Sequence, residues 1–263
     1  MRVLGFDQQD VKLLGVFWSM SVRDKYMGSR LGRVWAVANP LLMLALFTFV
    51  FGFVFKMRVP GAETTFSYAI WLISGYGPWL ATAEALMAAS MSVVASAGLV
   101  KNMPFKTEIL PVTASMTGLL PLGVCLGFLG VLLVVDGNTP SWHAVFGVVL
   151  VVVQFALVIA LGFFTSVITV FVRDFGIALP NLLTVVLFAT PIFYPLASTP
   201  PLVQAMSMAN PFYILVEGYR RALIYHHAPD LAGLLYVAGL SAVLAVVGLK
   251  LFRRYKGYFE ARL

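Results

Sequence analysis

Charged residues are scarce in this sequence. Only 11% of the 263 residues are Asp, Glu, Lys or Arg, whereas a soluble domain carries about 25%. Hydrophobic residues make up 60%, and the mean hydropathy is +0.92. The stretches 34–55, 109–135 and 231–249 contain no charge, and each is close to the roughly 20 residues that cross a hydrocarbon core of about 30 Å. A soluble domain is therefore excluded, and we predict an integral membrane protein.

Residues that commonly carry chemistry are also few. The single cysteine, Cys125, lies in an apolar run, so no disulfide can form within the chain. The three histidines, His143, His226 and His227, form no metal-binding pattern, and no GxxxxGK[ST] phosphate loop occurs. No serine or cysteine triad is suggested. We predict that this chain is not an enzyme and carries no catalytic residue, metal or cofactor of its own.

Ionisable residues inside the apolar stretches are rarer still. Glu84 is the only clear example, and such residues are costly in hydrocarbon and are often functional. An ion-coupled carrier generally needs several of them, which argues against that class. The net charge of +7 does not indicate nucleic acid, because the basic residues flank hydrophobic runs, where they set orientation and contact anionic lipid headgroups.

Turn residues and charges divide the chain into six predicted membrane spans. The spans cover roughly residues 35–55, 67–90, 110–135, 143–170, 176–194 and 230–250. Between the last two, Pro200-Pro201 and Asn210-Pro211 each indicate a helix start with proline in the first turn. The first of these helices, residues 200–209, would extend only about 15 Å. We therefore predict two short re-entrant helices in the outer leaflet.

The first 33 residues are too short and too charged to contain a span. Val11, Leu14, Trp18, Val22 and Tyr26 recur at three- and four-residue spacing, which places them on one helical face. We predict an amphipathic helix lying in the headgroup plane. An ordinary solvated helix packed on the bundle is the alternative.

The distribution of basic residues predicts the orientation. All but four of the 18 Lys and Arg residues fall on segments that this topology places inside; the exceptions are Lys56, Arg58, Arg220 and Arg221. The positive-inside rule therefore favours a multi-pass protein with both termini in the cytoplasm. The predicted fold is all-α and forms one transmembrane domain over residues 1–263. It consists of the interfacial helix 1–33, the six-span bundle 34–250 and a cytoplasmic tail 251–263.

Several segments, in order along most of the chain, carry a family pattern. Residues 23–52 contain Ser-x-Leu-Gly-x-x-Trp and then Pro-Leu before a Phe-rich span, on Ser29, Leu31, Gly32, Trp35, Pro40 and Leu41. The segments 99–111 (LVKNMPFKTEILP), 172–175 (VRDF), 191–195 (PIFYP) and 210–223 (NPFYILVEGYRRAL) continue it. Together they resemble the membrane subunits of the polysaccharide-export ABC transporters. The resemblance is closer to the O-antigen and teichoic-acid exporters than to the group-two capsule exporters.

The resemblance implies a permease subunit that forms half of a channel. Two copies would pair as a homodimer, and two separate ATPase subunits carrying ATP and Mg would bind beneath them. The cargo would be a lipid-linked polysaccharide, with O-antigen the first expectation, moved from the inner leaflet across the cytoplasmic (inner) membrane of a bacterium. Capsular polysaccharide or teichoic acid moved by the same mechanism is an alternative, and a drug or small lipid is another cargo to consider.

A membrane-embedded lipid-linked glycan transferase is the alternative of another class. Such an enzyme would need clustered acidic or basic groups in a large loop. None of the loops predicted here is long enough to supply them.

Within this resemblance, residues 98–109 are the predicted segment of contact with the ATPase subunit, and we name them the coupling segment. A short helix there would sit in a groove of that subunit and transmit its movement. The contacts would come from Lys101, Asn102, Met103, Pro104, Phe105, Lys106 and Glu108. A plain cytoplasmic loop with orienting lysines is the alternative.

A second predicted set lies where the cargo lipid would enter. Arg23, Lys25, Tyr26, Arg30 and Arg33 border the inner headgroup region, and Arg can bind a lipid diphosphate through paired hydrogen bonds. Attraction to ordinary anionic lipid is the alternative.

The predicted glycan path uses aromatic side chains, because sugar C–H faces pack against rings. Tyr68, Trp71, Tyr76 and Trp79 lie in the second span together with Glu84. Trp71, Gly75 and Trp79 share one helical face at i, i+4 and i+8. The phenylalanines of the first span are expected to face lipid and to contribute to an interfacial aromatic belt instead. For Glu84, a hydrogen bond to a Ser or Thr hydroxyl in the bundle interior is an equal alternative.

The predicted outer gate lies on the second short helix. Glu217, Arg220 and Arg221 stand at i, i+3 and i+4, and they are flanked by four aromatic residues, Phe193, Tyr194, Phe212 and Tyr213. A local salt bridge worth only a few tenths of a kcal/mol is the alternative.

Overall fold

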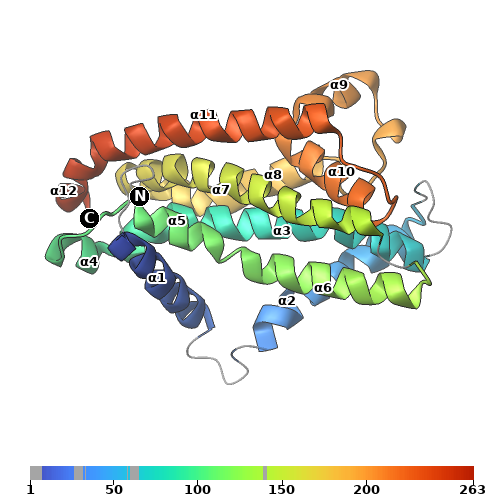
Figure 1. The fold of residues 1–263 in the computed structure, drawn as a ribbon, viewed down its shortest axis with the longest axis horizontal. Helices are drawn as coiled ribbons and strands as arrows, with labels where there is room; N and C mark the ends of the chain where they lie inside the picture. The colour runs from blue at the N-terminus through green and yellow to red at the C-terminus, as the bar shows by residue number, and fades with distance from the viewer. Residues whose placement is uncertain (1–7, 27–31, 33, 58, 60–64, 139–140) are drawn as a thin grey trace.

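The computed structural model describes residues 8–26, 32, 34–57, 59, 65–138 and 141–263, and within these ranges the fold is helical and contains no strand (Figure 1). The helices are α1 Gln8–Tyr26, α2 Val34–Phe47, α3 Thr65–Ala95, α4 Ala97–Asn102, α5 Ile109–Met116, α6 Leu119–Val135, α7 Phe146–Phe171, α8 Arg173–Ala189, α9 Pro201–Ala209, α10 Pro211–Leu223, α11 Leu231–Tyr255 and α12 Phe259–Arg262. A π-helical stretch, Thr48–Val54, continues α2. The predicted all-α class is confirmed for the part of the chain that the structure describes.

Five helical stretches among the described residues are long and apolar enough to cross a membrane. They are Val34–Val54, Phe66–Ala95, Ile109–Val135, Trp142–Phe171 and Leu231–Arg262, and they match the predicted first, second, third, fourth and sixth spans. The predicted fifth span corresponds to α8, which has 17 residues and is therefore only about 26 Å long at 1.5 Å per residue. It ends before Pro191, which has no backbone N–H to donate to a continuing helix. A sixth span therefore stays a prediction.

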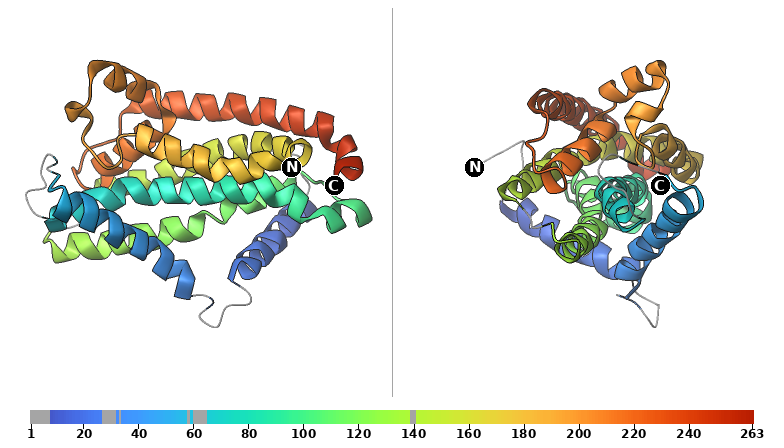
Figure 2. Two further views of the ribbon diagram at one scale, coloured as in Figure 1. Left: turned by 180° about the vertical axis from the view of Figure 1, so that it is seen from behind. Right: turned by 90° about the vertical axis from the view of Figure 1, so that its right-hand side faces the viewer.

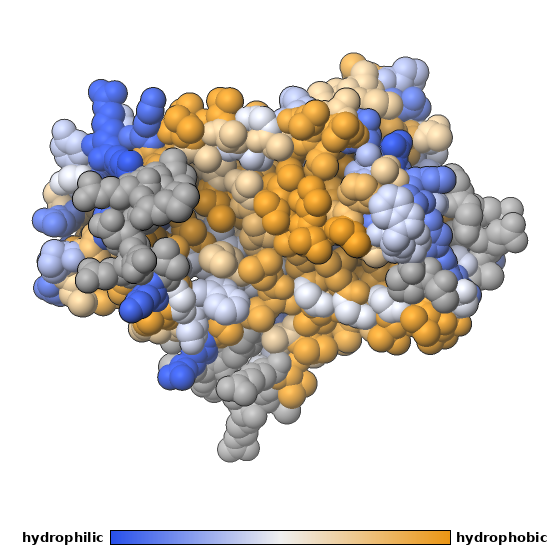
Figure 3. Space-filling model, viewed as in Figure 1, coloured by the Kyte–Doolittle hydropathy of each residue, from blue (hydrophilic) through white to orange (hydrophobic). Residues whose placement is uncertain are grey.

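The long helices lie alongside one another, with α3 in the middle of the bundle (Figure 2). Helix α3 contacts α5, α6, α7, α8 and α10. One end of the bundle holds α4, α12 and the beginning of α1, and the other end holds α9, α10 and the end of α6. Hydrophobic residues form a broad band over the middle of the face in Figure 3, and hydrophilic residues gather at both ends. This is the arrangement of a multi-pass membrane protein.

A break divides the third predicted span. Helix α5 ends at Met116 and α6 begins at Leu119, with Gly118 at the close approach to α3. A Cβ added at Gly118 would stand 2.4 Å from the carbonyl oxygen of Ala81 and 2.8 Å from the Ala85 Cβ. Any other residue would push α3 away at this point, because a backbone atom cannot move aside cheaply.

Helix α1 packs on the bundle. Trp18 donates a hydrogen bond from Nε1 to the carbonyl oxygen of Met116 at 3.3 Å, and the Phe17 ring lies 5.6 Å from the Phe105 ring, centroid to centroid. Leu14, Trp18 and Val22 of the predicted apolar face are partly buried. These contacts agree with a helix packed on the bundle, and a position in the headgroup plane stays a prediction.

The two short helices predicted from proline are confirmed as α9 and α10. Helix α9 begins at Pro201, and α10 begins at Pro211 after Asn210, whose side chain accepts a hydrogen bond from the Phe212 N–H at 3.0 Å. This is the N-cap contact that satisfies an otherwise unpaired donor of the first turn. Their depth in the membrane stays a prediction.

The last residues differ from a simple tail. Helix α11 continues to Tyr255, and the chain then turns so that α12 packs back on the bundle. Phe259 is fully buried, with its ring centroid 5.2 Å from that of Phe252 in an edge-on arrangement. The difference arises because Phe259 buries its apolar side chain, whereas the basic residues around it indicate a solvated tail.

Candidate functional site

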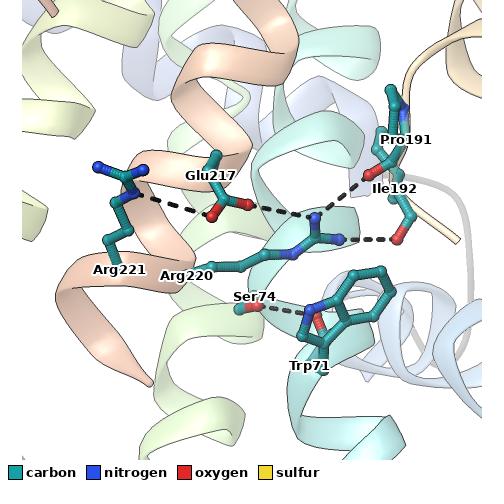
Figure 4. Close-up of polar contacts among 7 residues, drawn as sticks. All are labelled: Trp71, Ser74, Pro191, Ile192, Glu217, Arg220 and Arg221. Carbon is teal, nitrogen blue, oxygen red and sulfur yellow. Dashed lines mark hydrogen bonds and ion pairs between the residues drawn. The ribbon is translucent and has the colours of Figure 1, made fainter. Parts of the chain in front are cut away.

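The end of the bundle formed by α9 and α10 contains a buried arginine, Arg220. It is 2% exposed and comes from α10 (Figure 4). Its guanidinium donates from Nη1 to the carbonyl oxygen of Pro191 at 3.2 Å and from Nη2 to that of Ile192 at 2.8 Å. Both carbonyls lie just beyond the end of α8. The planar fork of arginine suits two neighbouring acceptors in a way that lysine does not.

Helix α3 packs against the side chain of Arg220. The Arg220 Cζ atom lies 3.6 Å from the centroid of the Trp71 ring, which is within cation–π range. A Cβ added at Gly75 would stand 2.8 Å from Arg220 Nη2 and 3.0 Å from Val216 Cγ1. One turn further, the Trp79 ring packs edge-on against Phe212 at 5.4 Å. The predicted common face of Trp71, Gly75 and Trp79 is confirmed, and α10 covers it.

The carboxylate of Glu217 completes this cluster. Its Oε2 lies 3.7 Å from Arg220 Nη1, and its Oε1 lies 3.8 Å from Nε of Arg221 (Figure 4). Glu217 is partly buried and Arg221 is exposed. The three charged residues of the predicted outer gate therefore do lie together, and Arg220 is the one that connects α10 to α3 and to the segment after α8.

The aromatic residues predicted around the gate are divided between two environments. Phe193 is 1% exposed and packs against Phe47 and Phe51 at ring-centroid distances of 4.7 and 4.9 Å. Its carbonyl oxygen accepts a hydrogen bond from the Tyr68 hydroxyl at 2.9 Å. Tyr194, Phe212 and Tyr213 are only partly buried.

The four aromatic residues of the predicted glycan path are core residues of this chain. Tyr68, Trp71, Tyr76 and Trp79 are at most 5% exposed. They pack on α2, on the segment after α8 and on α10, and therefore do not line an open channel within one chain. A role in a path stays a prediction, and it would require a second copy or a movement of α10.

A buried amide, Gln154 on α7, joins three helices and was missed in the sequence. It is fully buried, and its Nε2 donates to the Pro78 carbonyl oxygen at 2.8 Å and to Thr82 Oγ1 at 3.1 Å. Its Oε1 accepts from the Tyr219 hydroxyl at 2.8 Å. The available signal was that Gln154 is the one amide side chain in the apolar run 143–170.

The opposite end of the bundle carries the coupling segment. Helix α4 and the turn after it stand out at this end (Figure 1), and Lys101, Asn102, Met103 and Pro104 are exposed. Phe105 and Lys106 are partly buried. The exposed part of the predicted segment is therefore available to a partner.

Glu108 differs from that expectation. Its side chain is 2% exposed, and Oε1 accepts from Arg253 Nε at 3.2 Å and from Lys256 Nζ at 3.1 Å. Burial alone would raise the pKa of Glu108, but a hydrogen bond from its own backbone and those from Lys256 and Arg253 outweigh burial and lower the pKa. The carboxylate is held inside the chain and is not presented to a partner, because the end of α11 covers it.

A crevice of about 860 Å³ opens between α1, α3, α4 and α5. Its wall includes Phe17, Met20, Glu84 and Met91. The structure therefore places Glu84 beside α1, in a different group of residues from the aromatic face that meets α10.

The profile of the ABC-2 type transporter family matches residues 13–224, which is most of the chain. This chain belongs to the ABC-2 type transporter family. The matched residues run from α1 through α10 and include the coupling segment and the Arg220 cluster. The family is one of transporters and not of enzymes.

Three relatives show how far the similarity of this ABC-2 protein extends. It is 27% identical over 240 residues to the O-antigen export system permease protein RfbA of Myxococcus xanthus, covering 90% of each chain. It is also 27% identical over 249 residues to RfbA of Klebsiella pneumoniae, covering 94% of this chain and 93% of the relative. The polysialic acid transport protein KpsM of Escherichia coli is 24% identical over 254 residues, covering 95% of both.

The residues predicted to receive the cargo lipid are only partly described in this ABC-2 protein. Arg23 is exposed at the end of α1. Lys25 and Tyr26 belong to α1 by their backbone, and their side chains lie outside the described part. Arg30 and Arg33 lie outside the described residues altogether. Among the described residues, no group of three or more His, Cys, Asp or Glu side chains is placed to hold a metal.

Proposed function

We propose that this chain is the permease subunit of an ATP-driven ABC exporter of a lipid-linked polysaccharide, with O-antigen as the first candidate cargo. The observation that carries the proposal is the similarity over about nine tenths of the chain to two proteins named as O-antigen export permeases. The match to a polysialic acid transport protein supports capsular polysaccharide as the second candidate. Teichoic acid remains the third.

The energy source lies on another subunit. This sequence has no phosphate loop, so ATP and Mg would be bound by two separate ATPase subunits. The exposed coupling segment supports docking there, because Lys101 and the residues up to Pro104 stand out at one end of the bundle. A second copy of the chain would complete the channel as a homodimer.

The proposed topology has six spans in the cytoplasmic membrane of a bacterium, with both termini on the cytoplasmic side. Helix α8 serves as a short fifth span, and α9 and α10 are re-entrant helices of the outer leaflet. The distribution of basic residues supports this orientation. Helices α4 and α12, which carry Lys101 and Arg262, lie at the end opposite α9 and α10 (Figure 1). This agrees with a cytoplasmic end that is rich in basic residues.

The outer gate would open by separation of α10 from α3. Arg220 and the aromatic face around Trp71 hold these helices together, and parting them would expose aromatic rings on which sugars can pack. At the inner side, Arg23, Lys25, Tyr26, Arg30 and Arg33 would contact the phosphates of the cargo lipid. The two ends would be linked through α3, which runs from the gate to the coupling segment.

Deletion of the gene in its own host tests the proposal. We expect the glycan to accumulate inside the cell on its lipid carrier and to be missing from the surface, and expression of the unaltered chain to restore it. Normal surface glycan in the deletion strain would refute polysaccharide export and would favour a small-lipid or drug cargo.

Charge reversal at both Lys101 and Lys106 tests the coupling segment. We expect less ATPase subunit to co-purify with the double variant than with the unaltered chain. The matched control reverses Lys12 and Lys250, two exposed basic residues that lie outside this segment and outside residues 251–263. Unchanged stoichiometry in the double variant would move the contact elsewhere.

A further inference from the structure

The chain after Tyr255 folds back against the coupling segment. Helix α12 contacts both α4 and α7. Arg173, at the start of α8, donates from Nη2 to the carbonyl oxygen of Arg262 at 3.4 Å. The C-terminal residues 251–263 therefore meet the coupling segment, α7 and α8 at the same end of the bundle.

Glu108 is the polar connection between the two segments. It is the residue immediately before α5, and its two partners, Arg253 and Lys256, are 145 and 148 residues away along the chain. Both partners are partly exposed, with 42% and 44% of their side chains accessible, whereas Glu108 is buried. A buried carboxylate is costly unless it is paired, so this end of α11 must stay paired with Glu108 while Glu108 is charged.

An apolar anchor fixes the same segment from the other side. Phe259 is fully buried, and its ring lies 5.2 Å from Phe252 and 6.3 Å from Phe171, centroid to centroid. Phe252 in turn packs against Phe163 of α7 at 5.8 Å. The C-terminal residues are therefore held to α7 by packing and to the coupling segment by charge.

A helix as short as α4 does not keep its own shape in water. It has six residues, whereas isolated helices shorter than about 12–15 residues are marginal. A force applied to it by a partner reaches the spans only if a rigid contact connects the two. The pairs at Glu108 supply such a contact to α11, in addition to the chain connections to α3 and α5.

We propose that residues 251–263 are a brace for the coupling segment, and that Glu108 is the positioning residue through which movement of the ATPase subunit reaches α11. The proposal rests on the proposed function, since it presumes a separate ATPase subunit. It adds a second route into the bundle, because the coupling segment would act on α11 and α7 as well as on α3 and α5. Contiguous packed and paired residues of this kind are able to carry coupling between distant sites.

The test uses the Glu108→Gln variant in the complete transporter, with its ATPase subunits and in its own host. Four quantities are measured: the membrane level of the chain, the amount of ATPase co-purified, ATP hydrolysis by the purified complex, and surface glycan. We expect the first two to stay within about twofold, and glycan exported per ATP hydrolysed to fall by about fivefold or more, which is the size of a typical coupling effect. A merely structural role would lower hydrolysis and export together and leave their ratio unchanged.

Glu260→Gln is the matched control, because it makes the same change on an exposed glutamate of residues 251–263 that is not paired with Glu108 in the described contacts. We expect it to behave as the unaltered chain. If Glu108→Gln does not accumulate in the membrane, Lys256→Met replaces it, since removal of a partly exposed donor leaves Arg253 to pair with the carboxylate. A smaller fall of the same ratio is then expected.

An unchanged ratio of export to hydrolysis in the variant would overturn the brace and leave the proposed function intact. If no ATPase subunit co-purifies with the unaltered chain, both the brace and the proposed function would be overturned. The two failures are therefore distinguishable in one set of preparations.

Discussion

Replacement of Arg220 by alanine is expected to be strongly destabilising. The change removes hydrogen bonds to the carbonyls of Pro191 and Ile192, the contact with the Trp71 ring and the ion pair with Glu217. Hydrogen bonds to a charged group contribute about 1.5–3 kcal/mol each, and a desolvated cation–π contact about 2 kcal/mol. The desolvation of a buried arginine offsets part of this sum, so we expect the free energy of unfolding to fall by about 3–5 kcal/mol.

Arg220→Lys separates charge from geometry. A lysine keeps the positive charge over Trp71, but its ammonium group cannot reach two carbonyls as the planar fork does. We expect a loss of about 1–3 kcal/mol, less than for alanine. The control is Arg221→Ala on the same helix, because this arginine is 45% exposed and contacts the same glutamate at 3.8 Å. An exposed pair of this kind contributes at most about 1 kcal/mol.

The assay is denaturant unfolding of the purified chain in mixed micelles, followed by tryptophan fluorescence. Membrane level and surface glycan are measured in the same strains. Equal losses for Arg220→Ala and Arg221→Ala would refute the reasoning, since they would mean that burial and the carbonyl contacts contribute nothing. A loss for Arg220→Lys as large as that for alanine would refute the division between charge and geometry.

Three further changes test other contacts in the same structure. Gly75→Ala would place a Cβ 2.8 Å from Arg220 Nη2, so we expect the free energy of unfolding to fall by about 1–3 kcal/mol. A double-mutant cycle should show that this loss largely disappears when Arg220 is already alanine. Gln154→Leu leaves the Pro78 carbonyl and the Tyr219 hydroxyl without their partner; unfolding experiments should give a loss of about 2–4 kcal/mol, and a neutral result would deny the role of this amide. The pKa of Glu108 is lowered in the folded chain. Its stabilising contribution is therefore complete above the unfolded pKa of about 4.5, and it is lost as the pH falls through the lower folded value. Glu108→Gln should flatten the acid limb of a curve of unfolding free energy against pH, and an unchanged limb would contradict the pairing.

The parts of the fold that follow from local signals were predicted from the sequence. Five of the six predicted spans match apolar helical stretches, because a long uncharged run has few other solutions. The starts of α9 and α10 follow from Pro201 and Asn210-Pro211, because proline fits the first turn of a helix and asparagine caps it. The shared face of Trp71, Gly75 and Trp79 follows from the helical repeat alone.

The parts that depend on distant partners were not predicted. Local spacing places Arg220 among outer charges, whereas its burial depends on carbonyls 28 and 29 residues away. The resemblance implies that Glu108 lies at a partner surface, whereas its burial depends on residues at the far end of the chain. Neither pairing has a local spacing pattern. The shorter α8 likewise reflects where the chain turns after Ala189, which composition alone does not specify.

The most direct test of the proposed function is translocation by the purified transporter. The chain and its ATPase subunits are reconstituted in vesicles together with the lipid-linked glycan of their host, and the glycan that crosses the bilayer is measured with an enzyme confined to the receiving side. We predict that ATP makes the glycan accessible to that enzyme, and that the complex without ATP does not. Glycan that stays protected while the complex hydrolyses ATP would contradict polysaccharide export.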